Sequence, residues 1–228
     1  MEASMTLAIV CGMASEAAII GQPPGSVVII GAGDAAALSA KLEAAIAAGT
    51  DRVISVGICG GLNPALKAGD IVVGVRVTYG LATLACDPDW GGRLLEALTT
   101  ASLPFVTPAV FALSATAVAR LADKALLRAM TAADCVDEES FIAGSIAAAR
   151  GLPFAAMRVV CDPASFELPP AALIKLTAAG ADDIGAILAS IAGDPWQLAS
   201  LVELAGLSAT AMANLRAALA RIGPNFGA

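Results

Sequence analysis

Carboxylate side chains follow several short apolar runs along the chain. Glu16 lies just after the run at 5–11, Asp162 ends the run that begins at 153, and Asp137-Glu138-Glu139 follows the run at 133–136. The chain has no histidine, which excludes Ser-His-Asp and Cys-His catalysis and any His-ligated metal. Acid–base chemistry must therefore come from Asp, Glu, Lys, Tyr or Cys.

Glycines follow one of these runs at close spacing, in Gly57-Ile58-Cys59-Gly60-Gly61. Three glycines after a buried strand let backbone N–H groups approach a ligand closely. A turn with left-handed residues is the structural alternative for the same segment.

A second glycine pair, Gly31-Ala32-Gly33-Asp34, follows another apolar run and fits the start of a dinucleotide fingerprint. The next predicted strand ends in Gly57, however, and offers no acid to bind a ribose. Asp34 is also an ordinary residue to begin a helix. The pattern therefore favours a tight strand–helix turn over a nicotinamide site.

Composition and charge exclude several classes of protein. Of 228 residues, 58% are hydrophobic and 14% are charged, which excludes a disordered chain. With a net charge of −7, the chain lacks the basic surface that binding to nucleic acid or anionic lipid requires. Five cysteines without a CxxC pair argue against zinc and dithiol sites and predict buried, reduced thiols.

The location expected from these features is the cytoplasm. Reduced cysteines favour that compartment. The first residues carry an acid where a signal peptide needs a base. The longest uncharged stretch, 97–119, contains two prolines and six serines or threonines, so we expect no transmembrane segment.

Apolar runs alternate with helical patterns through most of the chain, which is typical of an α/β fold with a largely parallel sheet. We predict strands over 5–11, 26–31, 52–57, 70–77, 103–113, 133–136 and 153–160. We predict helices over 34–48, 88–101, 116–130, 138–150, 182–192, 195–205 and 208–222, the last two separated at Gly206. No linker or repeat divides the chain, so we expect one domain over 1–228, with 170–228 as a helical C-terminal extension.

In such sheets ligands bind outside the C-terminal ends of the strands. Glu139 and Asp162 follow two predicted strands that are separated by one helix, so we expect both side chains in one crevice. The alternative for the acids at 137–139 is a solvated helix start that suits the helix dipole.

Three segments resemble the nucleoside phosphorylase-I family, which includes purine nucleoside phosphorylases and methylthioadenosine/S-adenosylhomocysteine nucleosidases. VGICGGLNPALKAGDIVV (56–73) is similar to its first signature, and VDEESFIAGSIAAARGLPFAAMRVVCDPA (136–164) to its second. GMASEAA (12–18) resembles the end of the first strand in the nucleosidases. A narrower resemblance, in 124–131 and 162–172, is to the hopanoid-associated subgroup that cleaves adenosylhopane.

The family resemblance implies a three-layer fold with a mixed, mostly parallel sheet, and cleavage of the bond between ribose and a purine. It implies that Asp162 protonates purine N7, with burial favouring the protonated carboxyl. It also implies that Glu139 accepts hydrogen bonds from the ribose hydroxyls and that Glu16 activates water. Further substrate contacts are expected from the residues of the two signatures: Ile58, Gly60, Gly61, Glu138 and Phe154.

Two positions depart from the family pattern. Glu138 replaces the methionine that packs under the ribose, and it either turns outward or alters the site. Ile58 stands where phosphorylases have a phosphate-binding serine, and Ser55 where they have an arginine. Together with Glu16, this favours water as the nucleophile, with phosphate as the alternative co-substrate and no other cofactor.

The favoured substrate is adenosylhopane, whose large apolar group needs an apolar channel beside the ribose 5′ position. The C-terminal helices, with Trp196, Leu198, Leu201, Met212 and Phe226, border that channel, touch a membrane surface peripherally, or simply cover the sheet or an oligomer interface. The alternatives are a general methylthioadenosine/S-adenosylhomocysteine nucleosidase, a ligand-binding relative without turnover, and a dinucleotide oxidoreductase. The family resemblance also implies a homo-oligomer.

Overall fold

A central sheet of eight strands organises the computed structural model, which describes residues 6–100, 103 and 106–228. The strands are β1 (Thr6–Cys11), β2 (Ser26–Ile30), β3 (Thr50–Gly61), β4 (Ile71–Tyr79), β5 (Ala82–Ala85), β6 (Val106–Leu113), β7 (Cys135–Asp137) and β8 (Phe154–Val160). Their order is β2-β1-β3-β7-β6-β4-β5, and β8 pairs with both β3 and β4.

The sheet is mixed and mostly parallel, which confirms the predicted fold class. β1 pairs in parallel with β2 and β3, β3 with β8, and β6 with β4 and β7. The antiparallel pairs are β3 with β7, β4 with β5, and β4 with β8. Because β1, β3 and β8 run parallel, their C-terminal ends lie at one edge of the sheet, where the residues after each strand can meet.

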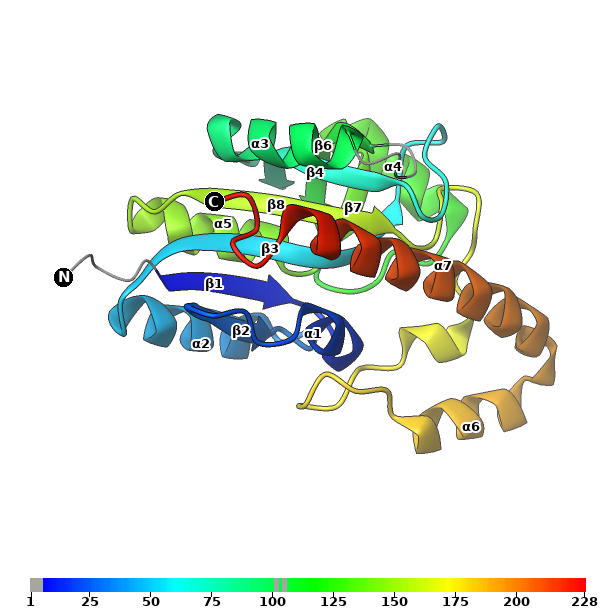
Figure 1. Ribbon diagram of the computed structural model, residues 1–228. Helices are drawn as coiled ribbons and strands as arrows, with labels where there is room; N and C mark the ends of the chain where they lie inside the picture. The colour runs from blue at the N-terminus through cyan, green and yellow to red at the C-terminus, as the bar shows by residue number, and fades with distance from the viewer. Residues whose placement is uncertain (1–5, 101–102, 104–105) are drawn as a thin grey trace.

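Helices cover both faces of the sheet and complete three layers (Figure 1). They are α1 (Ala14–Ile20), α2 (Ala35–Ala47), α3 (Pro88–Thr99), α4 (Leu121–Thr131), α5 (Ser140–Ala149), α6 (Ile184–Gly193) and α7 (Leu198–Ile222), with short 3₁₀ turns at Pro170–Leu173 and Pro195–Gln197. On one face α2 and α5 pack their apolar residues together with Phe111 and Phe154. On the other face α3 and α7 bury Trp90, Leu94 and Leu215.

The long helix α7 is buried over only part of its length. Its C-terminal half packs Ala211, Leu215 and Ala218 against the sheet. Its start and α6 extend beyond the edge of the sheet in Figure 1. Within the described residues, Pro195–Ile222 is one stretch long and apolar enough to cross a membrane, with 11% of its most apolar window buried, but core helices meet the same test.

Two predicted breaks are wrong. The glycine segment 57–61 is not a left-handed turn: it continues β3, because Ile58 and Cys59 pair with β8 and Gly60 with β7, which satisfies the backbone. Gly206 does not end a helix, since α7 runs through it, at a cost of about 1 kcal/mol relative to alanine. The predicted helix over 116–130 begins only at Leu121.

Other local predictions agree with the structure. Ala32 and Gly33 have positive φ angles of 54° and 67°, and the Asp34 carboxylate accepts a hydrogen bond from Ala37 N at 2.9 Å, as in a tight strand–helix turn. All five cysteines are buried free thiols. Residues 101–102 and 104–105, within or beside a predicted helix and a predicted strand, lie outside the described residues.

Candidate active site

A fully buried arginine, Arg158 on β8, lies between acidic side chains at the centre of the candidate site. Its Nε is 3.0 Å from Asp137 Oδ2, and its Nη2 is 3.2 Å from Glu139 Oε2. Nη2 also donates to the hydroxyl of Ser55 at 2.7 Å. Burial alone would lower the pKa of Arg158, but Asp137, Glu139 and Glu16 raise it more, so the guanidinium stays charged.

Glu16, on the first turn of α1, is held beside this arginine by three backbone donors. Its Oε2 accepts from Gly12 N at 2.7 Å and Met13 N at 2.8 Å, and its Oε1 accepts from Ile58 N at 2.7 Å. Burial raises the pKa of Glu16, while Arg158 and these donors lower it in part. A carboxyl whose pKa is raised toward neutrality can take a proton from water.

Glu139 turns inward rather than capping its helix. Asp137 caps α5 instead, because its Oδ1 accepts from Glu139 N at 3.1 Å and Ser140 N at 2.8 Å. Ser140 Oγ in turn donates to Asp137 Oδ2. The solvated-cap alternative is therefore wrong for Glu139, which is buried beside Arg158.

Glycines allow these carboxylates to lie against the strand ends. A Cβ on Gly12 would come within 2.9 Å of Glu139 Oε1, and a Cβ on Gly57 would overlap Glu16 Oε1. A Cβ on Gly31 would come within 3.0 Å of the Glu139 side chain. The glycines after β1 and β2 thus serve the approach of Glu139, in place of a dinucleotide.

Asp162, just after β8, lies further along the same edge. Its Oδ2 is 2.7 Å from Lys124 Nζ and would be 3.3 Å from a Cβ on Gly60. Burial raises the pKa of Asp162, and Lys124 offsets part of that rise. On β3, Asp162 lies against Gly60 and Glu16 lies against Gly57. These two glycines are three residues apart, which corresponds to roughly 10 Å along a strand.

Glu16, Glu139 and Asp162 thus lie along one edge of the sheet, with spacing that suits the length of a nucleoside. Glu16 and Glu139 both contact Gly12, while Asp162 lies over Gly60. Gly61 lets the following loop approach, since its Cβ would be 3.2 Å from Pro163 Cα.

Not every predicted site residue lies there. Phe154 is at the opposite end of β8 from Asp162, pairs with Val53, and packs against Gly144 in the core, so the substrate-contact prediction for it is wrong. Glu138 is half-buried near Gly33, and burial raises its pKa, with Asp137 adding to the rise and Lys175 opposing it. Ile58 contributes its backbone N–H, to Glu16.

Sequence reasoning missed two basic residues, Arg158 and Lys124. Arg158 stands in the Arg-x-x-Cys-Asp end of the second signature, four residues before Asp162, and that spacing was the available signal. Lys124 is 38 residues from Asp162, and the signal that joined them was the narrower resemblance, which rests on 124–131 and 162–172.

Changing Glu139 to glutamine is expected to flatten the pH dependence of stability. Burial raises the pKa of Glu139 to about 8, with Arg158 opposing and neighbouring acids adding to the rise. The pKa of Glu139 is about 8 in the folded state and about 4.5 in the unfolded state. The protonated carboxyl therefore stabilises the fold fully below about pH 4.5, and this stabilisation is lost as pH rises through about 8. The native protein should therefore lose up to ~1.4 kcal/mol per pH unit between pH 5 and 8 from this group.

Urea unfolding at several pH values measures this slope. The variant Glu43→Gln, whose residue lies in an exposed ion pair with Arg150, is the matched control and should keep the native slope. Equal slopes in the native protein and Glu139→Gln would show that Glu139 does not titrate in this range.

Comparison with protein families connects this geometry to known chemistry. A family model described as the phosphorylase superfamily matches residues 5–192. A search of curated protein sequences gave no match.

Solved structures with the same fold include three bacterial enzymes. A 5′-methylthioadenosine/S-adenosylhomocysteine nucleosidase from Neisseria meningitidis, in complex with methylthio-immucillin-A, has a TM-score of 0.69 at 17% identity over 95% of this chain and 97% of its own. Futalosine hydrolase of Helicobacter pylori has a TM-score of 0.66 at 13% identity over 94% and 97%. The Campylobacter jejuni 5′-methylthioadenosine/S-adenosylhomocysteine nucleosidase has a TM-score of 0.61 at 14% identity over 86% and 98%.

Proposed function

Because the chain belongs to the phosphorylase superfamily, an enzyme superfamily, we propose that it cleaves the N-glycosidic bond of a purine nucleoside. The observation that carries this proposal is the placement of Glu16, Glu139 and Asp162 along one edge of the sheet, where they lie against glycine residues. The nucleosidases with the same fold give independent support.

Each carboxylate has a distinct role in this reaction. Asp162 protonates N7, so that the purine leaves as a neutral base. Glu139 pairs with Arg158 through Oε2, while Oε1, above Gly12, accepts hydrogen bonds from the ribose hydroxyls. Glu16 accepts a proton from the attacking water as an oxocarbenium-like sugar forms.

Water is the nucleophile that this arrangement favours. Arg158 is paired with Asp137 and Glu139, so its charge is already compensated. Ser55 is fully buried and accepts a hydrogen bond from Arg158. Arg76, another arginine that could bind phosphate, is exposed on β4. A phosphate dianion would find little uncompensated positive charge beside Glu16, and phosphorolysis is the alternative.

The substrate that we favour carries a large apolar 5′ group, as adenosylhopane does. Gly180 O accepts a hydrogen bond from Ala14 N at 2.8 Å, so the loop before α6 contacts the turn that holds Glu16. That loop leads directly into α6, where Ile184 and Leu188 are exposed. Trp196, 92% exposed, follows before α7. We take these exposed apolar residues as the surface that receives a lipid chain or a membrane, joined to the site through the loop at Gly180.

A small soluble nucleoside such as methylthioadenosine is the second candidate, supported by the nucleosidases that share the fold. The third candidate is a ligand-binding relative without turnover. Glu138 replaces an apolar residue beside Glu139, and its charge adds to the rise in the pKa of Glu139 that burial causes.

Adenine release separates these candidates. We expect release from adenosylhopane in vesicles that is independent of phosphate and faster than from methylthioadenosine. Strong phosphate dependence would overturn hydrolysis, and preferential turnover of methylthioadenosine would overturn the lipid-linked substrate. Adenine binding without any turnover would support the ligand-binding alternative.

Replacing Trp196 with serine tests the apolar surface. Loss of a large apolar contact of about 1.5–3 kcal/mol should reduce kcat/KM for adenosylhopane roughly tenfold or more, with methylthioadenosine turnover unchanged. The matched control is Leu81→Ser, which changes a fully exposed apolar residue in the turn between β4 and β5. Equal turnover of adenosylhopane by both variants would contradict a role for this surface.

A further inference from the structure

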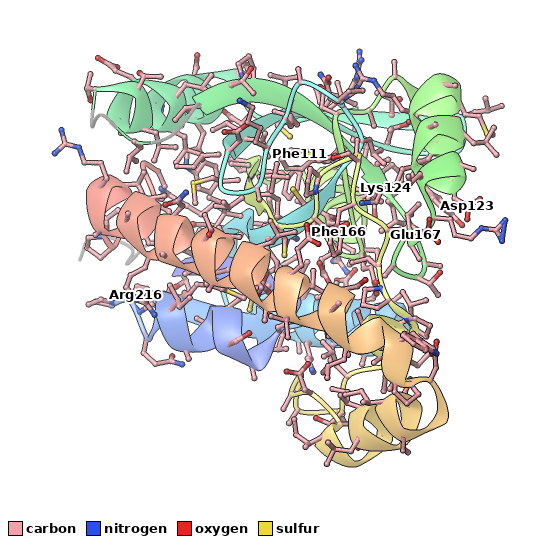
Figure 2. All side chains as sticks on the ribbon, turned by 90° about the vertical axis from the view of Figure 1, so that its right-hand side faces the viewer. Phe111, Asp123, Lys124, Phe166, Glu167 and Arg216 are labelled. Carbon is pink, nitrogen blue, oxygen red and sulfur yellow. The ribbon has the colours of Figure 1, made fainter. Side chains whose placement is uncertain are left out.

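Lys124, on α4, is a buried cation outside the residues assigned so far. Its side chain is 1% exposed. Figure 2 shows it directed toward the loop that carries Phe166 and Glu167, whereas Asp123, the preceding residue, lies on the outer side of α4. A buried lysine is costly unless its charge is paired, so its surroundings decide its state.

Four oxygens surround the Lys124 amino group. Nζ donates to Asp162 Oδ2 at 2.7 Å and to the carbonyl oxygens of Pro163 and Phe166, each at 2.9 Å, with the Asp162 carbonyl at 3.4 Å. An ammonium has three N–H donors and no acceptor, so the three short contacts match the protonated form. Asp162 Oδ2 is therefore one of the oxygens that satisfy the buried amino group.

The carboxylate of Asp162 has two different oxygens as a result. Oδ2 accepts the hydrogen bond from Lys124, and both oxygens lie over Gly60, where a Cβ would be 3.3 Å from Oδ2 and 3.5 Å from Oδ1. A Cβ on Gly60 of β3 would meet the apolar Val136 side chain of β7 at 3.2 Å as well as Asp162, and Lys124 is the charged side chain that shifts the pKa of Asp162. The nearby titratable thiol of Cys161 has its pKa raised to about 12 by burial, with Asp162 adding to the rise, and is neutral.

We propose that Lys124 is a positioning residue for the reaction, which anchors Asp162 Oδ2 so that Oδ1 faces purine N7 and which sets the acidity of that carboxyl. This inference rests on the proposed function for its role in turnover. Its physical part, control of the proton affinity of Asp162, stands independently of turnover.

The ammonium acts on both sides of the proton transfer. Asp162 takes up one proton from solvent before each turnover. The Asp162 O–H bond then breaks as the N7–H bond forms, and the electron pair of the ribose–purine bond moves to the leaving purine. Lys124 keeps its own protons and stabilises the Asp162 carboxylate that results. It thereby makes Asp162 a stronger acid, but leaves less of it protonated at high pH.

The titration of Asp162 tests this directly. Carbon-13 labelling of aspartate carboxyl groups, with the Asp162 signal identified by its loss in Asp162→Asn, reports the pH at which this group ionises. In the native protein we expect a carboxylate at pH 7. In Lys124→Met the midpoint should rise by about 1–3 pH units, because an adjacent opposite charge lowers a carboxyl pKa by that amount. The control Asp123→Asn should leave the midpoint unchanged.

Unchanged midpoints in Lys124→Met would overturn the proposal. If Lys124→Met does not fold, the same titration is made on Lys124→Gln. Glutamine lacks the charge but keeps two N–H donors for the loop carbonyls. A protonated Asp162 at pH 7 in the native protein overturns the proposal without any variant.

Turnover gives the second measurement. With the substrate cleaved by the native enzyme, the alkaline decline of kcat/KM should move to higher pH in Lys124→Gln. A merely structural role would lower kcat/KM equally at every pH and would overturn the positioning role. A native protein that releases no adenine refutes the proposed function, while the carboxyl titration still decides what Lys124 does.

Discussion

Replacing Asp162 with asparagine should lower kcat/KM for adenine release by about 10²–10⁴-fold while the fold is retained. The amide keeps the shape of the carboxyl but cannot deliver a proton to N7. Lys124 keeps its contacts to the carbonyl oxygens of Pro163 and Phe166, so the loop should stay in place. Steady-state kinetics of adenine release measure the loss, and thermal unfolding checks the fold.

The control for this variant is Asp123→Asn, which removes an exposed carboxylate from α4 next to Lys124. Its turnover should match that of the native enzyme. Near-normal turnover in Asp162→Asn would show that another group protonates the purine.

Replacing Arg158 with methionine should destabilise the protein by about 3–5 kcal/mol, a large part of a typical ~5–15 kcal/mol. The change leaves Asp137 and Glu139 buried without the cation that lies 3.0 and 3.2 Å from them. It also removes the charge that lowers the pKa of Glu16. Equilibrium unfolding in urea measures the loss, provided that the variant is compared at matched pH.

The pH dependence identifies the cause of this loss. Without Arg158 the folded-state pKa values of Glu16 and Glu139 rise further, so both carboxyls stay neutral and tolerated at low pH, and the cost of ionising them appears as pH rises through about 8, the native pKa of Glu139. The destabilisation should therefore be smaller at pH 5 than at pH 8. Arg150→Met, which breaks an exposed pair with Glu43, should cost under about 1 kcal/mol. An Arg158→Met loss that does not change with pH would indicate lost packing instead.

The alternation of apolar runs and helical patterns was sufficient to predict the α/β fold. Strands such as Thr6–Cys11 and Phe154–Val160 are short and buried, so pattern and propensity agree there. The pairing of β8 with both β3 and β4, in contrast, depends on contacts between residues far apart in the chain. No local signal in the sequence carries that information.

The same distinction applies to the site. Glu139 and Asp162 follow strands directly, so the rule that ligands bind at strand ends located them. Lys124 reaches Asp162 from a helix on another part of the chain, which only the folded structure shows. Phe154 lies in the same signature segment as Asp162, but it stands at the start of the seven-residue strand β8, whereas Asp162 follows the end of that strand. Two residues of one sequence motif therefore lie in different parts of the fold.

A structure of the protein with a non-hydrolysable C-nucleoside analogue of adenosine would test the central claim most directly. The three carboxylates should then contact one ligand: Glu139 Oε1 at the ribose hydroxyls, Asp162 at the position of N7, and Glu16 at a water below the anomeric carbon. An analogue bound with its base away from Asp162, or with its ribose away from Glu139, would contradict the account.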